Sequence, residues 1–140
     1  ETIREQGSPA VTIETGKETI LLVDYEEIIL DVGEALLTSL GYTVLTAQGG
    51  KEAITTLRNS LLSSPPALVI LDMIMPGMGG GETYDRMKEL SPTIKVLLSS
   101  GYSIDGQAKE ILKRGCNGFL QKPFTLGELS KAIREVVGEG

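Results

Sequence analysis

Residues 67–81 read ALVILDMIMPGMGGG, a continuous apolar run that ends in one carboxylate and is followed by a loop rich in Pro and Gly. Five consecutive apolar residues bounded by turn residues are typical of a strand buried on both faces, as in a parallel sheet. The sequence therefore predicts a central strand at Ala67–Leu71, with Asp72 at its carboxyl end.

Similar short runs recur on both sides of this strand, and helical periodicity separates them. The predicted strands besides Ala67–Leu71 are Ile20–Val23, Tyr42–Ala47, Ile94–Ser99 and Gly118–Gln121. The predicted helices are Glu26–Leu40, Lys51–Leu62, Glu82–Leu90, Gly106–Leu112 and a last one after Thr125-Leu-Gly-Glu128, which is a capping-box pattern.

The first predicted helix has an apolar face, as do the second and the last. Ile29, Val32, Leu36 and Leu40 follow one another at intervals of three and four, which places them on one face of a helix. Gly41 comes next, where a glycine commonly ends a helix.

Strand and helix alternate five times, which predicts an α/β fold with helices on both faces of a parallel sheet. We expect a flavodoxin-like (βα)5, doubly wound sheet with the strand order 2-1-3-4-5. Its ligand crevice is expected at the carboxyl ends of strands 1 and 3. Residues 1–17 are polar and without a sustained period, so we divide the chain into a linker or tail at 1–17 and one domain at 18–140.

Composition narrows the function. The 140 residues carry a net charge of −6, which argues against a nucleic-acid surface. The absence of histidine excludes a Ser-His-Asp triad, an HExxH zinc site and a histidine acid–base catalyst within these residues. No apolar run is long enough to span a membrane, so we expect a cytoplasmic location with no membrane in this segment.

Polar groups follow four of the predicted strands and should meet at one rim. Asp24 follows the first strand, Asp72 the third, Ser99-Ser100-Gly101 the fourth and Lys122-Pro123 the fifth. Taken singly, each is more simply a capping, turn or surface residue. Together they supply a carboxylate nucleophile, a second carboxylate for a hard cation, a hydroxyl and an ammonium, which suits phosphoryl transfer to an aspartate.

Residues 18–138 resemble the response-regulator receiver domain of two-component signalling along their whole length. The matching segments are ETILLVDYEE, GYTVLTA with GGKEA, LVILDMIMPGMGG, KVLLSSGYS and GCNGFLQKPFTLGEL. The LDMIMPGMGG and LQKPF blocks at this separation are specific to that family.

The resemblance implies a role for each matching position. Asp72 corresponds to the phosphorylated aspartate, and Asp24 to the first acid at the metal. Ile74 would lend its backbone carbonyl to a Mg²⁺ ion. Ser100 corresponds to the hydroxyl residue that binds the phosphoryl group, and Lys122 to the lysine that pairs with it. The remaining matches are Phe119, at the family's rotamer-switching aromatic, and Pro123, where the preceding peptide is often cis. A phenylalanine at position 119 is also explained by packing in the apolar core, so the sequence leaves both roles open.

One position departs from the family pattern, which has two or three acids in a row after the first strand. Asp24 is followed by Tyr25, and the missing acid is the one that normally contacts Mg²⁺. A tyrosine is neutral near pH 7 and is a poor ligand for a hard cation. We therefore expect weakened Mg²⁺ binding, unless Glu26 or Glu27 reaches the site.

Two functions follow from the resemblance. In the first, Asp72 accepts a phosphoryl group from a phosphohistidine on a histidine kinase or histidine phosphotransfer domain, and the modification switches a protein-interaction face. In the second, a degenerate receiver binds partners independently of phosphorylation because of Tyr25. The resemblance implies that the receiver itself is a phosphoacceptor rather than a turnover enzyme, and it leaves open whether the whole protein is an enzyme.

Two other activities on the same fold fit less well. A flavin carrier needs a hydroxyl-rich phosphate loop after strand 1, and an aspartate-nucleophile phosphatase needs an Asp where Ile74 stands. The junction before GKETILLVD resembles that between a kinase catalytic region and a C-terminal receiver, which implies a hybrid histidine kinase. A stand-alone regulator is the alternative.

Overall fold

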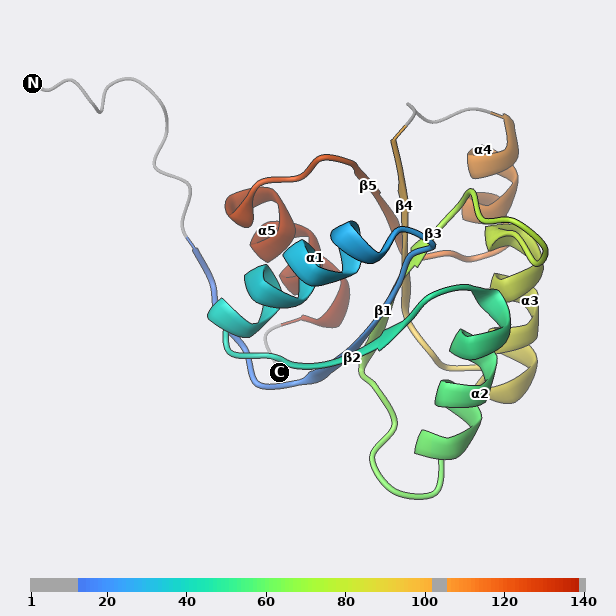
Figure 1. Cartoon of the computed structure of the whole chain (residues 1–140), viewed down its shortest axis with the longest axis horizontal. Coiled ribbons are helices and arrows are strands. Elements are labelled where there is room, and N and C mark those ends of the chain that lie inside the picture. The colour runs from blue at the N-terminus through green and yellow to red at the C-terminus, as the bar shows by residue number, and fades with distance from the viewer. Residues whose placement is uncertain (1–12, 102–105, 139–140) are drawn as a thin grey trace, which may run out of the picture.

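The computed structural model describes residues 13–101 and 106–138, which form one five-stranded parallel sheet covered by helices on both faces (Figure 1). The elements, in chain order, are β1 (Thr19–Val23), α1 (Glu27–Ser39), β2 (Thr43–Ala47), α2 (Gly50–Ser60), β3 (Leu68–Asp72), α3 (Gly80–Leu90), β4 (Val96–Ser100), α4 (Gly106–Lys113), β5 (Gly118–Gln121) and α5 (Leu126–Val137). The strand order is β2-β1-β3-β4-β5, so the predicted flavodoxin-like fold is confirmed.

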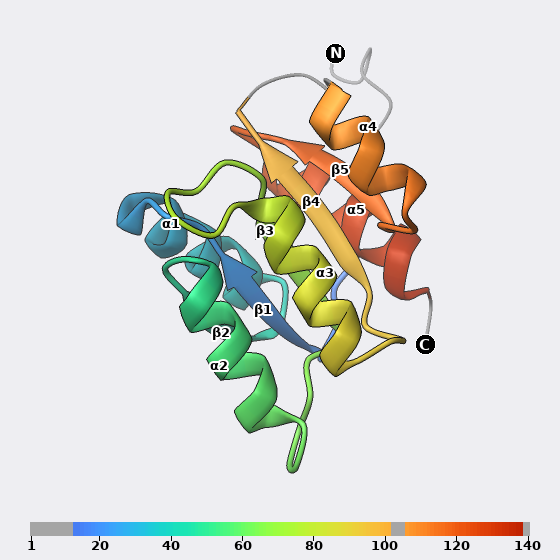
Figure 2. The ribbon, with the colours of Figure 1, turned by 90° about the vertical axis from the view of Figure 1, so that its right-hand side faces the viewer.

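The sheet separates two apolar cores. Helices α1 and α5 cover one face, and α2, α3 and α4 cover the other (Figures 1 and 2). All five residues of β3 and all five of β4 are buried, as the unbroken apolar runs predict for inner strands of a parallel sheet. Alternate residues of the central strands supply the two cores: Ile70 packs in the core under α1 and α5, and Leu71 in the core under α2, α3 and α4.

The apolar face predicted for α1 is confirmed at Leu40, which is buried, and is wrong at Val32. Leu30, Gly33 and Leu37 are buried in this helix, whereas Val32 is 53% exposed. The reason lies in β1: a Cβ atom on Gly33 would come within 2.6 Å of a Leu22 methyl group, so the helix packs closest to the sheet at its glycine. Ile29 and Leu36 are therefore only half-buried, at the edge of the buried face, and together with Val32 they leave an apolar surface on α1.

The helix boundaries follow local chemistry. Thr125 Oγ1 accepts a hydrogen bond from the Glu128 amide at 3.1 Å, and the Glu128 carboxylate accepts one from the Thr125 amide at 2.9 Å, which confirms the capping box of α5. Gly41 follows Leu40, the C-cap residue of α1, and has φ = 101°, the left-handed conformation that glycine adopts without strain. A Cβ at Gly80 would lie 2.6 Å from Met73 Cα, so only glycine lets α3 begin this close to β3.

The segment that precedes β1 is attached to α5. The Glu14 amide donates to Ser130 Oγ at 2.7 Å, and the same hydroxyl donates to the Glu14 carbonyl at 2.9 Å. Arg134 of α5 binds both carboxylate oxygens of Glu18, at 3.1 and 3.0 Å, and donates to the Tyr42 hydroxyl at 3.2 Å. Residues 14–18 thus pack on the domain. The boundary at residue 17 stays a prediction, and residues 1–12 of the predicted tail lie outside the described residues.

Within the described residues, no helix has both the length and the apolar character needed to cross a membrane.

Candidate phosphoacceptor site

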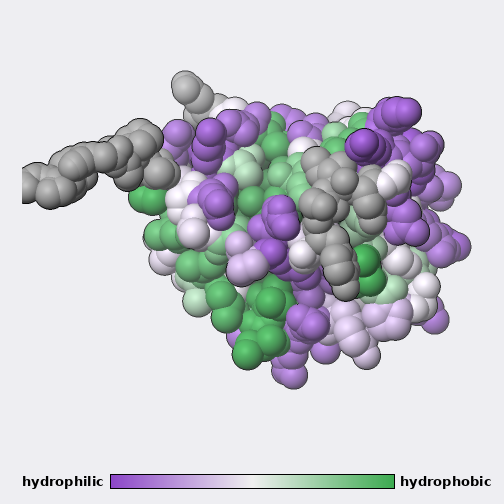
Figure 3. All heavy atoms as spheres, turned by 90° about the horizontal axis from the view of Figure 1, so that it is seen from above, coloured by the Kyte–Doolittle hydropathy of each residue, from purple (hydrophilic) through white to green (hydrophobic). Residues whose placement is uncertain are grey.

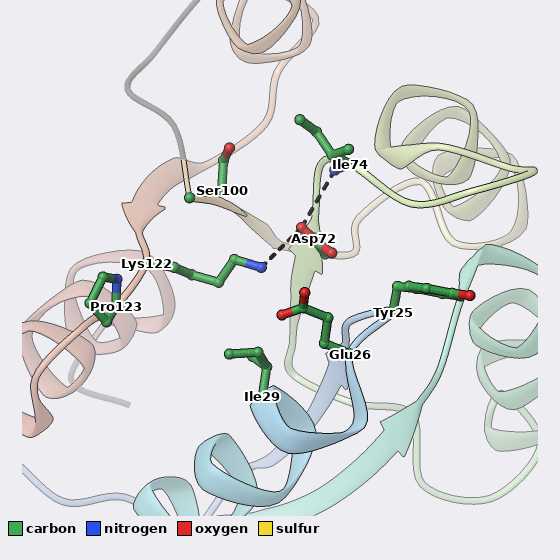
Figure 4. Close-up of a pocket in the computed structure, with 9 residues that line it drawn as sticks. Tyr25, Glu26, Ile29, Asp72, Ile74, Ser100, Lys122 and Pro123 are labelled. Atoms are coloured by element: carbon green, nitrogen blue, oxygen red, sulfur yellow. Dashed lines mark hydrogen bonds and ion pairs between the residues drawn. The ribbon is translucent and has the colours of Figure 1, made fainter.

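Four strands bring the predicted site residues to the carboxyl edge of the sheet. Asp24 follows β1. Asp72 ends β3, Ser100 ends β4 and Lys122 follows β5 (Figure 4). The register of the parallel strands brings these residues to the same level along the strand direction, because Asp72 lies opposite Ser99, and Ser100 lies opposite Gln121. The four residues therefore meet because every strand points the same way, as the strand-end positions predict.

The ammonium group of Lys122 lies between the two carboxylates. Its Nζ is 2.9 Å from Asp24 Oδ2 and 3.3 Å from Asp72 Oδ1, so it forms a salt bridge with each of them. Asp24 and Asp72 are 1% and 4% exposed, which makes this a buried three-charge cluster. Two carboxylates against one ammonium leave it with a net negative charge.

Burial and charge act on the acid and the base in opposite ways. Burial raises the pKa of Asp72 above its ordinary value, and the neighbouring Asp24 charge raises it further, although Lys122 partly offsets both. For Lys122, burial alone would lower the pKa, but the hydrogen bond to Asp24 and the charge of Asp72 more than compensate and raise the pKa above normal. Lys122 is therefore held as a cation beside a carboxylate that is costly to keep ionised.

Backbone hydrogen bonds fix the two strand ends that carry these groups. The Lys122 amide donates to the Ser100 carbonyl at 2.7 Å, and the Met73 amide donates to the Ser99 carbonyl at 2.9 Å. The Lys122–Pro123 peptide bond is cis, as the family resemblance implies. Ser100 is 2% exposed and belongs to the wall of the site.

An open cleft of about 570 Å³ lies over this cluster. Its lining combines the site residues with side chains from the start of α1 and the loop after β3: Tyr25, Glu26, Ile29, Asp72, Ile74, Ser100, Gly101, Lys122 and Pro123. A cleft that exposes one carboxylate of a buried cluster to a ligand is a suitable place for group transfer.

The two residues after Asp24 lie differently in this cleft. The Tyr25 side chain extends away from Lys122, whereas the Glu26 carboxylate points into the cleft on the side of Asp72 and Lys122 (Figure 4). The sequence left the position of Glu26 open, because one residue of register at the start of a helix redirects a side chain completely.

The contacts of two further predicted site residues, Ile74 and Phe119, do not establish the roles predicted for them. The Ile74 amide donates to Asp72 Oδ1 at 3.4 Å, and its side chain is 53% exposed at the cleft. Phe119 is partly buried, lies opposite Leu98 in the sheet and packs against the core of the α2–α4 face. Its role as a switch stays a prediction.

The donor set suits a metal that also binds phosphate. Among the described residues, no group of three or more His, Cys, Asp or Glu side chains is arranged to hold an ion by itself. Mg²⁺, however, is commonly bound by one or two carboxylates together with phosphate oxygens and water. Asp24, Asp72 and the Ile74 carbonyl match that lower requirement, and the excess negative charge of the cluster favours a cation.

Comparison with known proteins gives the family of this chain. The family model described as response regulator receiver domain matches residues 20–134. The sensor kinase CckA of Brucella abortus is 33% identical over 123 residues, which are 88% of this chain and 13% of that protein. The chain thus spans a small part of this relative, and transcriptional regulators also occur among the relatives.

Solved structures show the same fold. A receiver domain from Clostridium thermocellum has a TM-score of 0.78 at 31% identity, over 86% of this chain and 94% of that one. The receiver domain of a sensor histidine kinase from Pseudomonas aeruginosa, with a magnesium ion coordinated in its active-site cleft, has a TM-score of 0.77 at 23% identity, over 89% of this chain and all of that one.

Proposed function

Because the chain belongs to the response regulator receiver domain family of two-component signalling, we propose that it accepts a phosphoryl group on Asp72. The observation that carries this proposal is the Asp24–Lys122–Asp72 cluster at the floor of an open cleft. The donor is a phosphohistidine on a histidine kinase or a histidine phosphotransfer protein.

In the transfer, a carboxylate oxygen of Asp72 attacks the phosphorus atom. The phosphorus–nitrogen bond to the imidazole breaks, its electron pair stays on the nitrogen, and an acyl phosphate forms on Asp72. The phosphoryl oxygens gain partners in the Lys122 ammonium and the Ser100 hydroxyl, which stabilise the charge that spreads over them.

Mg²⁺ belongs to this proposal as a charge-neutralising cofactor held by Asp24, Asp72 and the Ile74 carbonyl. When bound, it shields the incoming phosphoryl group from the two carboxylates. The magnesium ion in the Pseudomonas receiver domain supports the assignment.

An apolar groove beside the cleft supports docking of the donor protein. It is lined by Ile29, Val32, Gly33, Leu36, Lys122, Pro123 and Phe124, and so shares Ile29, Lys122 and Pro123 with the phosphoacceptor cleft. Figure 3 looks onto this end of the molecule and shows apolar surface next to hydrophilic surface. A partner helix that covers the exposed face of α1 would place its phosphohistidine over Asp72.

Phosphorylation then shifts the population of two conformations of the domain. The acyl phosphate makes contacts with Ser100 and Lys122 that the free carboxylate does not make, and such differential contacts bias an equilibrium. We place the responding face at α4, β5 and α5, with Ser100 and Phe119 as the switch residues.

The decisive experiment is labelling. Incubation with a small acyl-phosphate donor and Mg²⁺ should add one phosphoryl group by mass, and Asp72→Asn should abolish it, whereas Asp31→Asn, at an exposed position of α1, should not. Label that persists undiminished in Asp72→Asn contradicts the assignment. Val32→Glu should slow transfer from a phosphorylated kinase far more than transfer from the small donor, because only the kinase needs the groove.

Tyr25 favours a second function, a receiver that binds its partner without phosphorylation. This residue stands where the family has a metal-binding acid. The two functions separate in the same experiment: the second predicts no labelling at saturating Mg²⁺ and partner binding that is equal in the wild type and Asp72→Asn.

A further inference from the structure

Glu26, at the start of α1, places a carboxylate at the cleft, although Tyr25 stands where the family has an acid. Tyr25 is 50% exposed, and its carbonyl accepts a hydrogen bond from Gln48 Nε2 at 3.0 Å, which fixes the backbone at the mouth of the cleft. The next residue, Glu26, donates its amide to Asp24 Oδ1 at 2.9 Å. Beside this bond, the Glu26 carboxylate points toward Asp72 and Lys122, whereas the Tyr25 side chain points away from them (Figure 4).

The Glu26 side chain does not cap α1, although Glu26 is the N-cap residue of this helix. Glu26 is the N-cap residue of α1, and its carbonyl accepts hydrogen bonds from the amides of Ile29 and Leu30. Its side chain makes no capping hydrogen bond with the helix. The carboxylate instead borders the same cleft as Asp72 and Lys122, whereas Glu27 is not part of that lining.

The Glu26 carboxylate increases the electrostatic attraction of the cleft for a divalent cation. Lys122 already bridges Asp24 and Asp72, so a divalent cation that enters the cleft must compete with an ammonium for the same two acids. A third carboxylate at the cleft mouth raises the local attraction for the cation. Mg²⁺ also keeps several of its waters when bound, and a carboxylate near the site accepts hydrogen bonds from such waters.

We infer that Glu26 supplies the acid that Tyr25 lacks, and that it acts on the cation through the cation's waters. This outer position is consistent with the described residues, in which no three acids are arranged to ligate one ion directly. The inference rests on the proposed function, because it concerns the cation of the same site. It assigns Glu26 as a positioning residue for Mg²⁺.

The competing explanation is a surface glutamate that only stabilises the positive end of α1. Glu27 is the matched control, since it lies one residue further along in the first turn of the same helix. Glu26→Gln and Glu27→Gln should change the free energy of unfolding by similar small amounts. Only Glu26→Gln should change metal affinity.

The test is a calorimetric titration of the unphosphorylated domain with MgCl₂ at constant ionic strength. We expect Glu26→Gln to weaken Mg²⁺ binding about tenfold, the lower end of the effect of losing an outer-sphere carboxylate. Glu27→Gln should bind as the wild type does. Adding Tyr25→Asp to Glu26→Gln should restore the affinity, because the new acid occupies the family's metal-binding position.

Equal affinities for the wild type and Glu26→Gln overturn the inference, as does a wild type that does not bind Mg²⁺. Equal weakening in both glutamate variants also overturns it, because it shows a general helix-terminus effect. Labelling of Asp72 by a small phosphate donor is read separately. If labelling occurs and the titrations coincide, only the role of Glu26 fails, and if labelling is absent, the proposed function fails.

Discussion

Replacing Asp72 by Asn should make the metal-free domain more stable, although it removes the proposed phosphoacceptor. Two opposing effects act on the carboxylate. Its attraction to the Lys122 ammonium at 3.3 Å amounts to about 5 kcal/mol at an effective dielectric constant of about 20. Against it stand the loss of hydration in a side chain that is only 6% exposed and the repulsion from Asp24.

The geometry bounds the repulsion. Oxygens of Asp24 and Asp72 bind the same Nζ atom at 2.9 and 3.3 Å, so these two oxygens lie within about 6 Å of each other. Their mutual repulsion is then about 3 kcal/mol or more under the same dielectric. Burying an ion costs several kcal/mol more. The unfavourable effects exceed the attraction, in agreement with the raised pKa of Asp72.

We expect Asp72→Asn to raise the free energy of unfolding by about 1–2 kcal/mol at neutral pH, the usual size of single-site effects. The assay is urea denaturation in a chelating buffer, followed by circular dichroism, with the exposed Asp31→Asn as the control. Saturating Mg²⁺ should narrow the difference, because the cation stabilises the wild type by mass action. A loss of stability in Asp72→Asn without metal would show that the Lys122 attraction dominates and would refute the reasoning.

Two further predictions concern the attachment of the segment before β1. Ser130→Ala removes a buried hydroxyl that both donates to and accepts from the Glu14 backbone, so unfolding in urea should become easier by about 1–2 kcal/mol. The Arg134 guanidinium holds the pKa of Glu18 below its ordinary value, so this pair stabilises the fold above the unfolded-state pKa and the contribution is lost as the pH falls through the folded-state pKa. Glu18→Gln should therefore cost about 0.5–1 kcal/mol at neutral pH and flatten the acid limb of the stability curve; an unchanged acid limb would contradict the pairing.

The fold was predictable because its signals are collective. The unbroken run at Leu68–Leu71 requires burial on both faces, and five alternations of strand and helix leave few topologies. The face of α1 was not predictable in the same way, because its apolar residues cover more than one stripe. Spacing favoured the stripe with Val32, whereas the close approach of Gly33 to Leu22 selects the neighbouring one. That selection depends on the partner strand, which periodicity within the helix does not contain.

The residues of the site also differ in how far the sequence predicts their positions. Asp24, Asp72 and Lys122 were predictable as neighbours because the ends of parallel strands share an edge, and a residue at a strand end has a fixed position there. The residues after Asp24 lie where the chain leaves the sheet, and their directions depend on the hydrogen bond from the Glu26 amide to Asp24.

A family pattern is compared with this chain one position at a time, so Tyr25 counts as the loss of an acid. The charge of the cleft depends on where a carboxylate lies, and Glu26, one residue later, borders the same cleft as Asp72. The loss of a family residue at one position is therefore weak evidence for a lost activity wherever a neighbouring position at a loop can supply the same charge.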